Sequence, residues 1–197
     1  MEEEAHMARE EPRGKPVGNA RDAPQVELVI FVGLQASGKS TFFRERFAAT
    51  HELVSKDLFR NNKNRNRRQT QLIEAALRAG SSVVVDNTNP TVEDRRPLIE
   101  LGRGLGARIV GYYFDCAVRE CLDRNRQRAG KARVPDVALY AAAKRLMRPS
   151  YSEGFDEIYR VRITGNSTFE VRAWTDKTDA CRGSCDQKGP GIPESGS

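Results

Sequence analysis

The 197-residue sequence predicts an α/β fold, a three-layer sandwich with a mainly parallel central sheet. The first observation behind this is an alternation along the chain. Short apolar runs typical of buried strands take turns with segments whose apolar residues recur at helical spacing. The second is the glycine-containing segment 33–40, GLQASGKS, between the first such strand and the first such helix. In this fold, functional residues are expected where the strands reach their carboxyl ends.

The predicted elements follow one another in order. The strand at 26–32 is a continuous apolar run, and the run at 82–86 is β-branched and bounded by turn residues. The helix at 69–79 has apolar residues on one helical face and is ended by Gly80. Further strands are expected at 52–55, 108–114 and 156–163, with a candidate edge strand at 168–174, and further helices at 40–49, 92–102, 118–128 and 136–147.

One domain, residues 25–174, is expected between two polar ends. Residues 1–24 are rich in Glu, Arg, Pro and Gly, and residues 175–197 in Gly, Ser, Pro and Asp, so both ends are expected to be disordered. The whole chain has a formal charge of +6, but residues 25–174 have 26 basic and 17 acidic side chains, a net charge of +9. Such a basic domain favours a polyanionic partner.

Composition and cysteine use indicate a cytoplasmic protein without a membrane span. No apolar stretch approaches the length of a span, and no secretory signal is present at the amino terminus. Cys116 and Cys121 lie in or beside apolar segments and are expected to be reduced core thiols. Cys181 and Cys185 form a CxxxC in the polar tail; because two ligands cannot complete a zinc site, we do not expect a metal there.

The segment 33–40 matches the P-loop pattern GxxxxGK[ST], in the strand–loop–helix context that this motif requires. Loop N–H groups and the helix N-terminus are suited to surround a β-phosphate. Lys39 is expected to reach the β- and γ-phosphates, and the Ser40 hydroxyl to bind Mg²⁺. We therefore expect a P-loop NTPase sandwich that uses ATP and Mg²⁺. The residues assigned to the nucleotide are Gly33, Ser37, Gly38, Lys39, Ser40 and Thr41.

Phosphoryl transfer also requires a carboxylate to accept a proton and cations to balance the γ-phosphate. Asp57 and Asp86 each follow a predicted strand and are the candidate carboxylates, with helix N-capping as the alternative role. The basic segment 119–128 and the flexible basic stretch 129–135 that follows it are expected to form a helical lid over ATP. Arg124 and Arg128, four residues apart, are predicted to share one helix face there, although a solvated basic face is the alternative.

Residues 56–68, KDLFRNNKNRNRR, contain six basic residues. Guanidinium groups and asparagine amides suit a phosphate backbone better than a compact apolar substrate, which favours a nucleic-acid acceptor. The alternative is a mobile loop whose charges only confer solubility.

These motifs in this order resemble the kinase domain of polynucleotide 5′-hydroxyl kinases, both phage-type enzymes and the kinase half of eukaryotic kinase-phosphatases. The resemblance extends over residues 26–165. The segments that carry it are GLQASGKST at 33–41, KDLFR at 56–60, VDNTNP at 85–90, RNRQR at 124–128, VPDV at 134–137 and EGFD at 153–156.

The resemblance implies transfer of the γ-phosphate of ATP to the 5′-hydroxyl end of DNA or RNA, in nucleic-acid end healing or repair. It implies that Asp57 is the general base, that Arg60 binds a phosphate of the acceptor strand, and that Asp86 organises the metal's water shell. Metal contacts are thus assigned to Ser40 and, through water, to Asp57 and Asp86. Catalysis is assigned to Asp57, Lys39 and Arg128, the ATP phosphates also to Arg124 and Arg128, and the acceptor to Arg60, Asp86, Asn87 and Thr88.

The chain departs from the family at Ser55-Lys56-Asp57, where Asn-Arg-Asp is usual, and it has no DxDGT phosphatase signature. A kinase without 3′-end healing is therefore expected. Two alternatives remain: a small-molecule kinase of the same fold, acting on a sugar acid, a nucleoside or an antibiotic, and a nucleotide-dependent nucleic-acid-binding protein without transfer activity. DNA or RNA preference, preferred end structure, donor preference and oligomeric state are not predicted.

Overall fold

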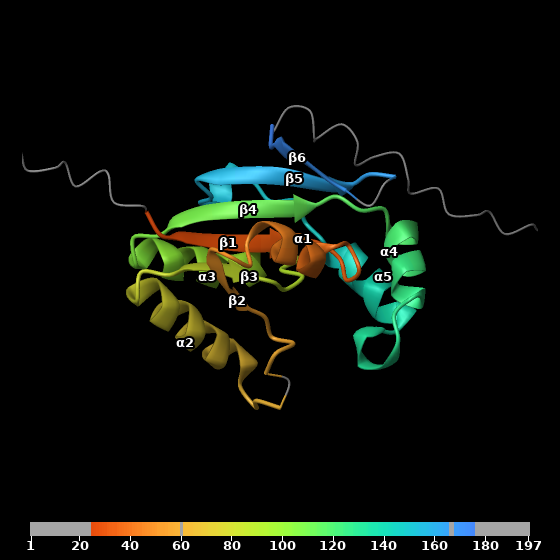
Figure 1. The fold of residues 1–197 in the computed structure, drawn as a ribbon, viewed down its shortest axis with the longest axis horizontal. Helices are drawn as coiled ribbons and strands as arrows, with labels where there is room; N and C mark the ends of the chain where they lie inside the picture. The colour runs from red at the N-terminus through yellow and green to blue at the C-terminus, as the bar shows by residue number, and fades with distance from the viewer. Residues whose placement is uncertain (1–24, 60, 166–167, 176–197) are drawn as a thin grey trace, which may run out of the picture.

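A computed structural model describes residues 25–59, 61–165 and 168–175 (Figure 1). Of the two ends expected at 1–24 and 175–197, residues 1–24 and 176–197, with Cys181 and Cys185, lie outside the described residues, as does Arg60. The elements are β1 (Glu27–Val32), α1 (Lys39–Arg46), β2 (His51–Val54), α2 (Arg65–Arg78), β3 (Ser82–Val85), α3 (Val92–Gly104), β4 (Arg108–Phe114), α4 (Val118–Arg126), η1 (Gly130–Ala132), α5 (Asp136–Arg145), η2 (Tyr151–Glu153), β5 (Glu157–Ile163) and β6 (Phe169–Ala173).

The strands form one six-stranded sheet in the order β2-β3-β1-β4-β5-β6. Every neighbouring pair is parallel except β5 and β6, which are antiparallel. Since β1 lies between β3 and β4, the chain leaves β1 and returns on both of its sides, which creates the crevice where ligands bind in such sheets. The predicted α/β class and the mainly parallel sheet are confirmed.

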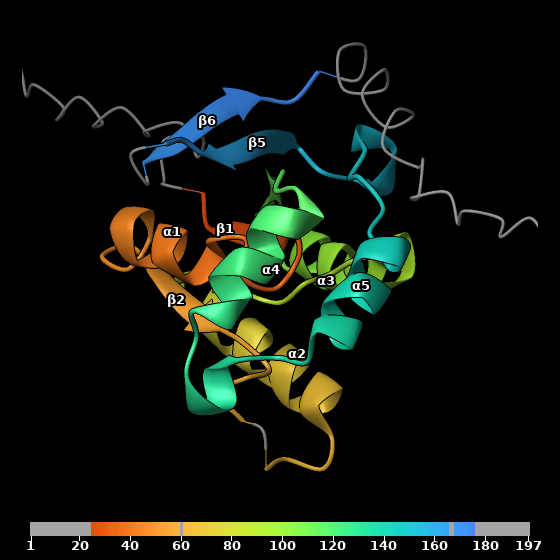
Figure 2. The ribbon, with the colours of Figure 1, turned by 90° about the vertical axis from the view of Figure 1, so that its right-hand side faces the viewer.

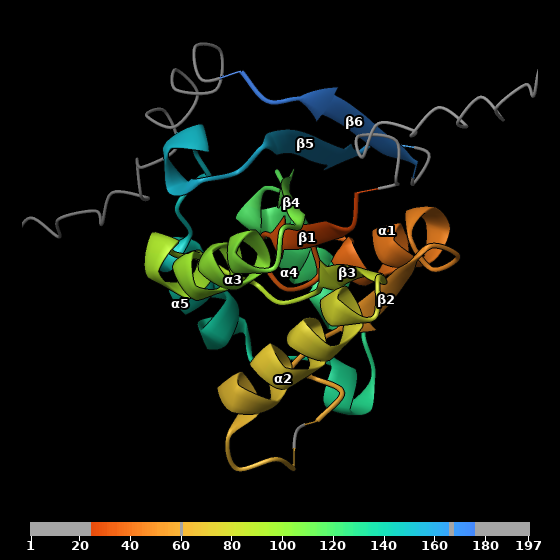
Figure 3. The same cartoon turned by 90° about the vertical axis from the view of Figure 1, so that its left-hand side faces the viewer.

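Helices cover both faces of the sheet, because β1 is apolar on both sides. Leu28 and Ile30 belong to a buried cluster with residues of α2 and α3, whereas Val29 and Phe31 pack with the phenylalanines of and after α1. Figure 3 shows α3 on one side of the sheet and α1 on the other. Helices α4 and α5 stand beyond the carboxyl ends of the strands (Figure 2), where Leu34 of the P-loop packs against their apolar residues.

Among the helix boundaries that differ from the sequence prediction, two concern predicted site segments. Helix α2 begins at Arg65, because the Asn64 side chain accepts a hydrogen bond from the Arg67 N–H at 3.0 Å and caps the helix. Residues 64–68 of the basic segment 56–68 are therefore helix or its cap rather than loop. Helix α4 ends at Arg126, so Arg128 lies beyond it rather than on a shared face with Arg124. Among the described residues, no helix is both long and apolar enough to cross a membrane.

Candidate active site

The P-loop turns tightly between β1 and α1, and its glycines are required there. Gly38 has a φ of +98°, and a Cβ at this position would lie 2.8 Å from the Ile163 Cδ1. A Cβ on Gly33 would lie 2.9 Å from the Phe114 Cβ. The Gly33 N–H donates to the Thr88 carbonyl at 3.0 Å, which ties the start of the loop to the segment after β3.

Lys39 is the first residue of α1, and its side chain is buried. Its ammonium donates to the carbonyls of Gly33 at 3.0 Å and Leu34 at 2.5 Å. Burial lowers the pKa of Lys39 to about 8; Asp86 and Asp57 oppose this shift and the positive charge of Arg128 adds to it. The charges of Asp86, Arg128 and Asp57 therefore all act on Lys39.

Ser40 and Asp86 meet at the carboxyl end of the sheet. The Ser40 hydroxyl donates to the Asp86 Oδ2 at 2.6 Å, and the Asp86 backbone N–H donates to the Val54 carbonyl of β2 at 3.0 Å. A hydroxyl and a carboxylate side by side are hard oxygen donors, of the kind that Mg²⁺ takes beside phosphates. The donor set at this position therefore fits the expected cation.

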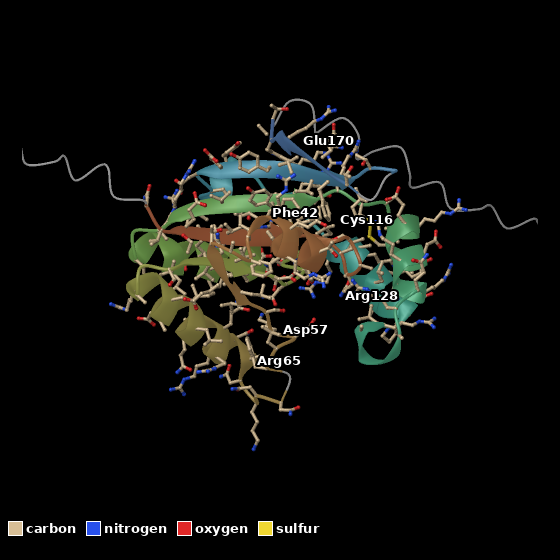
Figure 4. The ribbon with its side chains drawn as sticks, in the orientation of Figure 1. Phe42, Asp57, Arg65, Cys116, Arg128 and Glu170 are labelled. Atoms are coloured by element: carbon tan, nitrogen blue, oxygen red, sulfur yellow. A yellow bond between two sulfur atoms is a disulfide. The ribbon has the colours of Figure 1, made fainter. Side chains whose placement is uncertain are left out.

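A cavity of about 440 Å³ connects these groups. Its wall combines the P-loop, the turn after β2, the end of β3 and the segment after α4. Figure 4 shows that Asp57 and Arg128 come from different parts of the fold, the turn after β2 and the segment beyond α4. The predicted site residues that line it are Ser37, Gly38, Lys39, Ser40, Asp57, Asp86, Asn87, Thr88 and Arg128.

Three predicted residues do not line this cavity. Gly33 is at the start of the loop, where its N–H donates to the Thr88 carbonyl. Thr41 lies on α1, where its hydroxyl accepts from Arg44 at 3.3 Å. Arg124 donates from its Nε to the Ala36 carbonyl at 3.0 Å, so it supports the P-loop from behind. Ala36 is a non-glycine residue with a φ of +60°, a conformation that such support stabilises.

Asp57 lies on the turn that follows β2, and it is an exposed residue of the cavity wall. Its backbone N–H points to the Ser55 hydroxyl at 3.4 Å. The preceding residue, Lys56, is half-buried, and desolvation lowers its pKa, with Asp94 opposing and Arg65 reinforcing the shift. Lys56 is therefore close enough to Asp94 of α3 and to Arg65 at the start of α2 for both charges to act on it.

The segment after β3 forms hydrogen bonds with several neighbouring elements. The Asn87 side chain accepts from the Lys56 backbone N–H at 3.1 Å and donates to the Gln69 Oε1 at 2.7 Å. The Asn89 amide donates to the Phe31 carbonyl at 2.8 Å. This segment therefore links β1, β2 and α2, while the assignment of Asn87 and Thr88 to the acceptor stays a prediction.

The expectation of reduced thiols at Cys116 and Cys121 is wrong, because the structure joins them in a disulfide. Cys116 lies in the turn before α4 and Cys121 within its first turns, with their Cα atoms 6.5 Å apart. The turn after β4 folds back onto the helix, which a spacing of five residues does not reveal. The Arg124 guanidinium contacts the Cys116 sulfur at 2.7 Å. The disulfide therefore lies next to the arginine that donates to Ala36 of the P-loop.

The sequence interpretation missed Gln69 as a site residue. It is 5% exposed and lies on α2 in line with the buried Ile73 and Ala76. A glutamine on the apolar stripe of a helix is a signal that the sequence does contain, because a buried amide needs a hydrogen-bond partner. The partner itself, Asn87, could not be identified from spacing alone.

Comparison with known proteins identifies a family and several relatives. A family model described as an AAA domain matches residues 28–149, more than half of the chain. The bifunctional polynucleotide phosphatase/kinase of Schizosaccharomyces pombe is 28% identical over 141 residues, which are 68% of this chain and 33% of that protein. The chain thus spans a third of the length of this relative, and the resemblance to polynucleotide kinases is confirmed.

Similar solved structures include kinases of several kinds. A putative kinase from Chloroflexus aurantiacus superimposes with a TM-score of 0.57 and 18% identity, covering 75% of this chain and 93% of that one. A fungal RNA kinase gives 0.56 and 17%, covering 71% and 38%. A gluconokinase from Sinorhizobium meliloti gives 0.51 and 18%, covering 70% and 83%. At these identities the likeness shows the fold alone. The chain belongs to the AAA domain family, and its fold is that of the P-loop kinases.

Proposed function

We propose that this protein transfers the γ-phosphate of ATP to the 5′-hydroxyl end of a polynucleotide. The observation that carries the proposal is one cavity with a donor wall and an acceptor wall. Lys39 and Ser40 of the P-loop form the first, and Asp57 on the turn after β2 forms the second. A carboxylate facing a phosphate-binding loop is the arrangement that a kinase needs, since the acceptor hydroxyl must lose its proton.

On the donor wall, phosphate oxygens take over the hydrogen bonds that Lys39 makes to the loop carbonyls. N–H groups of the loop and of the α1 N-terminus add donors. Ser40 and Asp86 would hold Mg²⁺, Asp86 through water, and Asp57 would contact its water shell. The cation neutralises phosphate charge.

On the acceptor wall, Asp57 accepts the proton of the 5′-hydroxyl as that oxygen bonds to the γ-phosphorus. The bond from the γ-phosphorus to the β-phosphate oxygen breaks, and ADP leaves with the electron pair. Lys39 and Arg128, which act on one another electrostatically, stabilise the charge on the transferring group. Arg124 contributes by holding Ala36 of the P-loop.

The start of α2 supports a polymeric acceptor. Its first turn contains no acidic residue but has Arg65, Arg67 and Arg68, all exposed, with Lys63 just before it. Cations at a helix N-terminus oppose the helix dipole, so this placement is unfavourable without an external anion. Figure 4 shows Arg65 on the same side of the molecule as Asp57. A phosphate backbone leading away from Asp57 satisfies these arginines.

The S. pombe relative, named as a polynucleotide phosphatase/kinase, favours the same acceptor. A role in nucleic-acid repair in the cytoplasm belongs to this proposal. The competing acceptor is a small molecule, since a gluconokinase shares the fold. Salt separates the two, because affinity for a backbone held by several arginines falls steeply as ionic strength rises. Oligonucleotide affinity that does not change between low and high salt would exclude the backbone contact.

A further inference from the structure

Two side-chain amides, the buried Gln69 and the half-buried Asn87, connect α2 to the turn that carries Asp57. The backbone N–H of Lys56 can only donate, so the Asn87 atom that it contacts at 3.1 Å must be the oxygen. The Asn87 nitrogen then points to Gln69, whose oxygen accepts at 2.7 Å. The orientation of both amides is thus fixed by one main-chain donor.

The two amides lie where the parallel ladder of hydrogen bonds between β2 and β3 ends. The last main-chain bond joins the Asp86 N–H to the Val54 carbonyl at 3.0 Å. In a parallel ladder the next donor on β2 is the Lys56 N–H, which would bond to the backbone of β3. It bonds instead to the Asn87 side chain. The main chain is therefore free to leave the sheet at Lys56 and form the turn that presents Asp57 to the cavity.

We infer that Gln69 is a positioning residue, which acts through Asn87 and the Lys56 N–H to hold Asp57 at the acceptor wall. The inference rests on the proposed function for its catalytic consequence, though not for its structural one. Gln69 is 5% exposed and contacts Asn87 from α2, so water does not readily replace it. The same helix begins with Arg65, so α2 carries both Gln69 and one of the arginines proposed to contact the acceptor.

Without the Gln69 oxygen, the Asn87 nitrogen loses its buried acceptor and the amide no longer has one preferred orientation. The Lys56 N–H then opens to solvent more often, and Asp57 samples positions away from the acceptor. A displacement of about 1 Å of a catalytic group reduces turnover by up to about 100-fold. We expect a loss of about tenfold or more in kcat. The affinity for ATP should stay unchanged, because the Gln69 side chain bonds to Asn87 and not to a residue of the P-loop within the described part of the chain.

The test compares four variants of the full-length chain. Q69M removes the acceptor and retains the side-chain length on an apolar stripe, and Q69A removes it without placing a new side chain there. Q69E retains an accepting oxygen. Q71M is the matched control, because Gln71 is exposed on the same helix. Each variant is measured for hydrogen exchange at the Lys56 amide and for the signals of the Asn87 side-chain amide by NMR, for kcat with a 5′-hydroxyl oligonucleotide, and for the dissociation constant of ATP.

The expected result is faster exchange at Lys56 and an altered Asn87 signal in Q69M and Q69A, with both unchanged in Q71M and largely restored in Q69E. We expect kcat to fall in Q69M and Q69A, to stay unchanged in Q71M and to be largely restored in Q69E. The affinity for ATP should be the same in all four variants. Unchanged Lys56 exchange in Q69M and Q69A, or a fall in ATP affinity that matches the fall in kcat, would overturn the inference. The exchange measurement needs no substrate. A wild-type protein that phosphorylates no oligonucleotide therefore refutes the proposed function, and the exchange data still decide on Gln69.

Discussion

The lowered pKa of Lys39 gives a prediction about pH and nucleotide binding. Its pKa of about 8, against 10.5 in water, means that burial disfavours the ammonium by about 3 kcal/mol. A bound triphosphate pairs with the ammonium and raises this pKa again. Protonated Lys39 is therefore the form that binds, and affinity is lost as the pH rises through about 8. One pH unit above the pKa, only about a tenth of the free protein has the ammonium, so the dissociation constant rises about tenfold.

Equilibrium binding of a non-hydrolysable ATP analogue, measured from about pH 7 to about pH 9 at constant ionic strength, checks this expectation. K39M should bind weakly and without this pH dependence. K56Q is the matched control, because desolvation lowers the pKa of Lys56 as well, yet Lys56 does not line the cavity. An affinity that stays constant over this range in the wild type would refute the reasoning. So would a K39M variant with the wild-type slope, or a K56Q variant without it.

Three further predictions concern the base, the core and the disulfide. D57N should reduce kcat by about 10²- to 10⁴-fold with little change in ATP affinity, measured by turnover and direct binding; a collapse of that affinity would contradict the role of Asp57. G102A should destabilise the fold by about 1–3 kcal/mol in denaturant titration, because its Cβ would lie 2.6 Å from the Ile109 Cδ1; an unchanged midpoint would contradict that packing. Thiol labelling of the unfolded, unreduced protein should leave Cys116 and Cys121 unmodified, and labelling of both would contradict the disulfide.

The parts of the fold that depend on local signals could be predicted. The strand at 26–32, the P-loop and the following helix are consecutive in sequence, so their register needs no tertiary information. The joint position of Asp57 and Asp86 followed from a general property, because both come after parallel strands. The pairing of Ser40 with Asp86 at 2.6 Å follows from the same placement.

The parts that depend on tertiary contacts could not be predicted. Helix α2 starts at Arg65 because Asn64 caps it. The segment contains several asparagines, so the sequence does not show which of them is the cap. Arg124 was assigned to phosphates, but its guanidinium donates to Ala36, a residue 88 positions away. Gln69 and Asn87 are 18 residues apart, and no spacing rule connects them.

The central claim is transfer to a 5′-hydroxyl end, and one measurement tests it most directly. The protein is incubated with γ-labelled ATP, Mg²⁺ and a 5′-hydroxyl oligonucleotide, as DNA and as RNA, beside the same strands with a 5′-phosphate. We expect label on at least one 5′-hydroxyl strand and none on the 5′-phosphate controls, with D57N inactive. Absence of label from every 5′-hydroxyl strand, while a sugar acid or a nucleoside accepts it, would contradict the account.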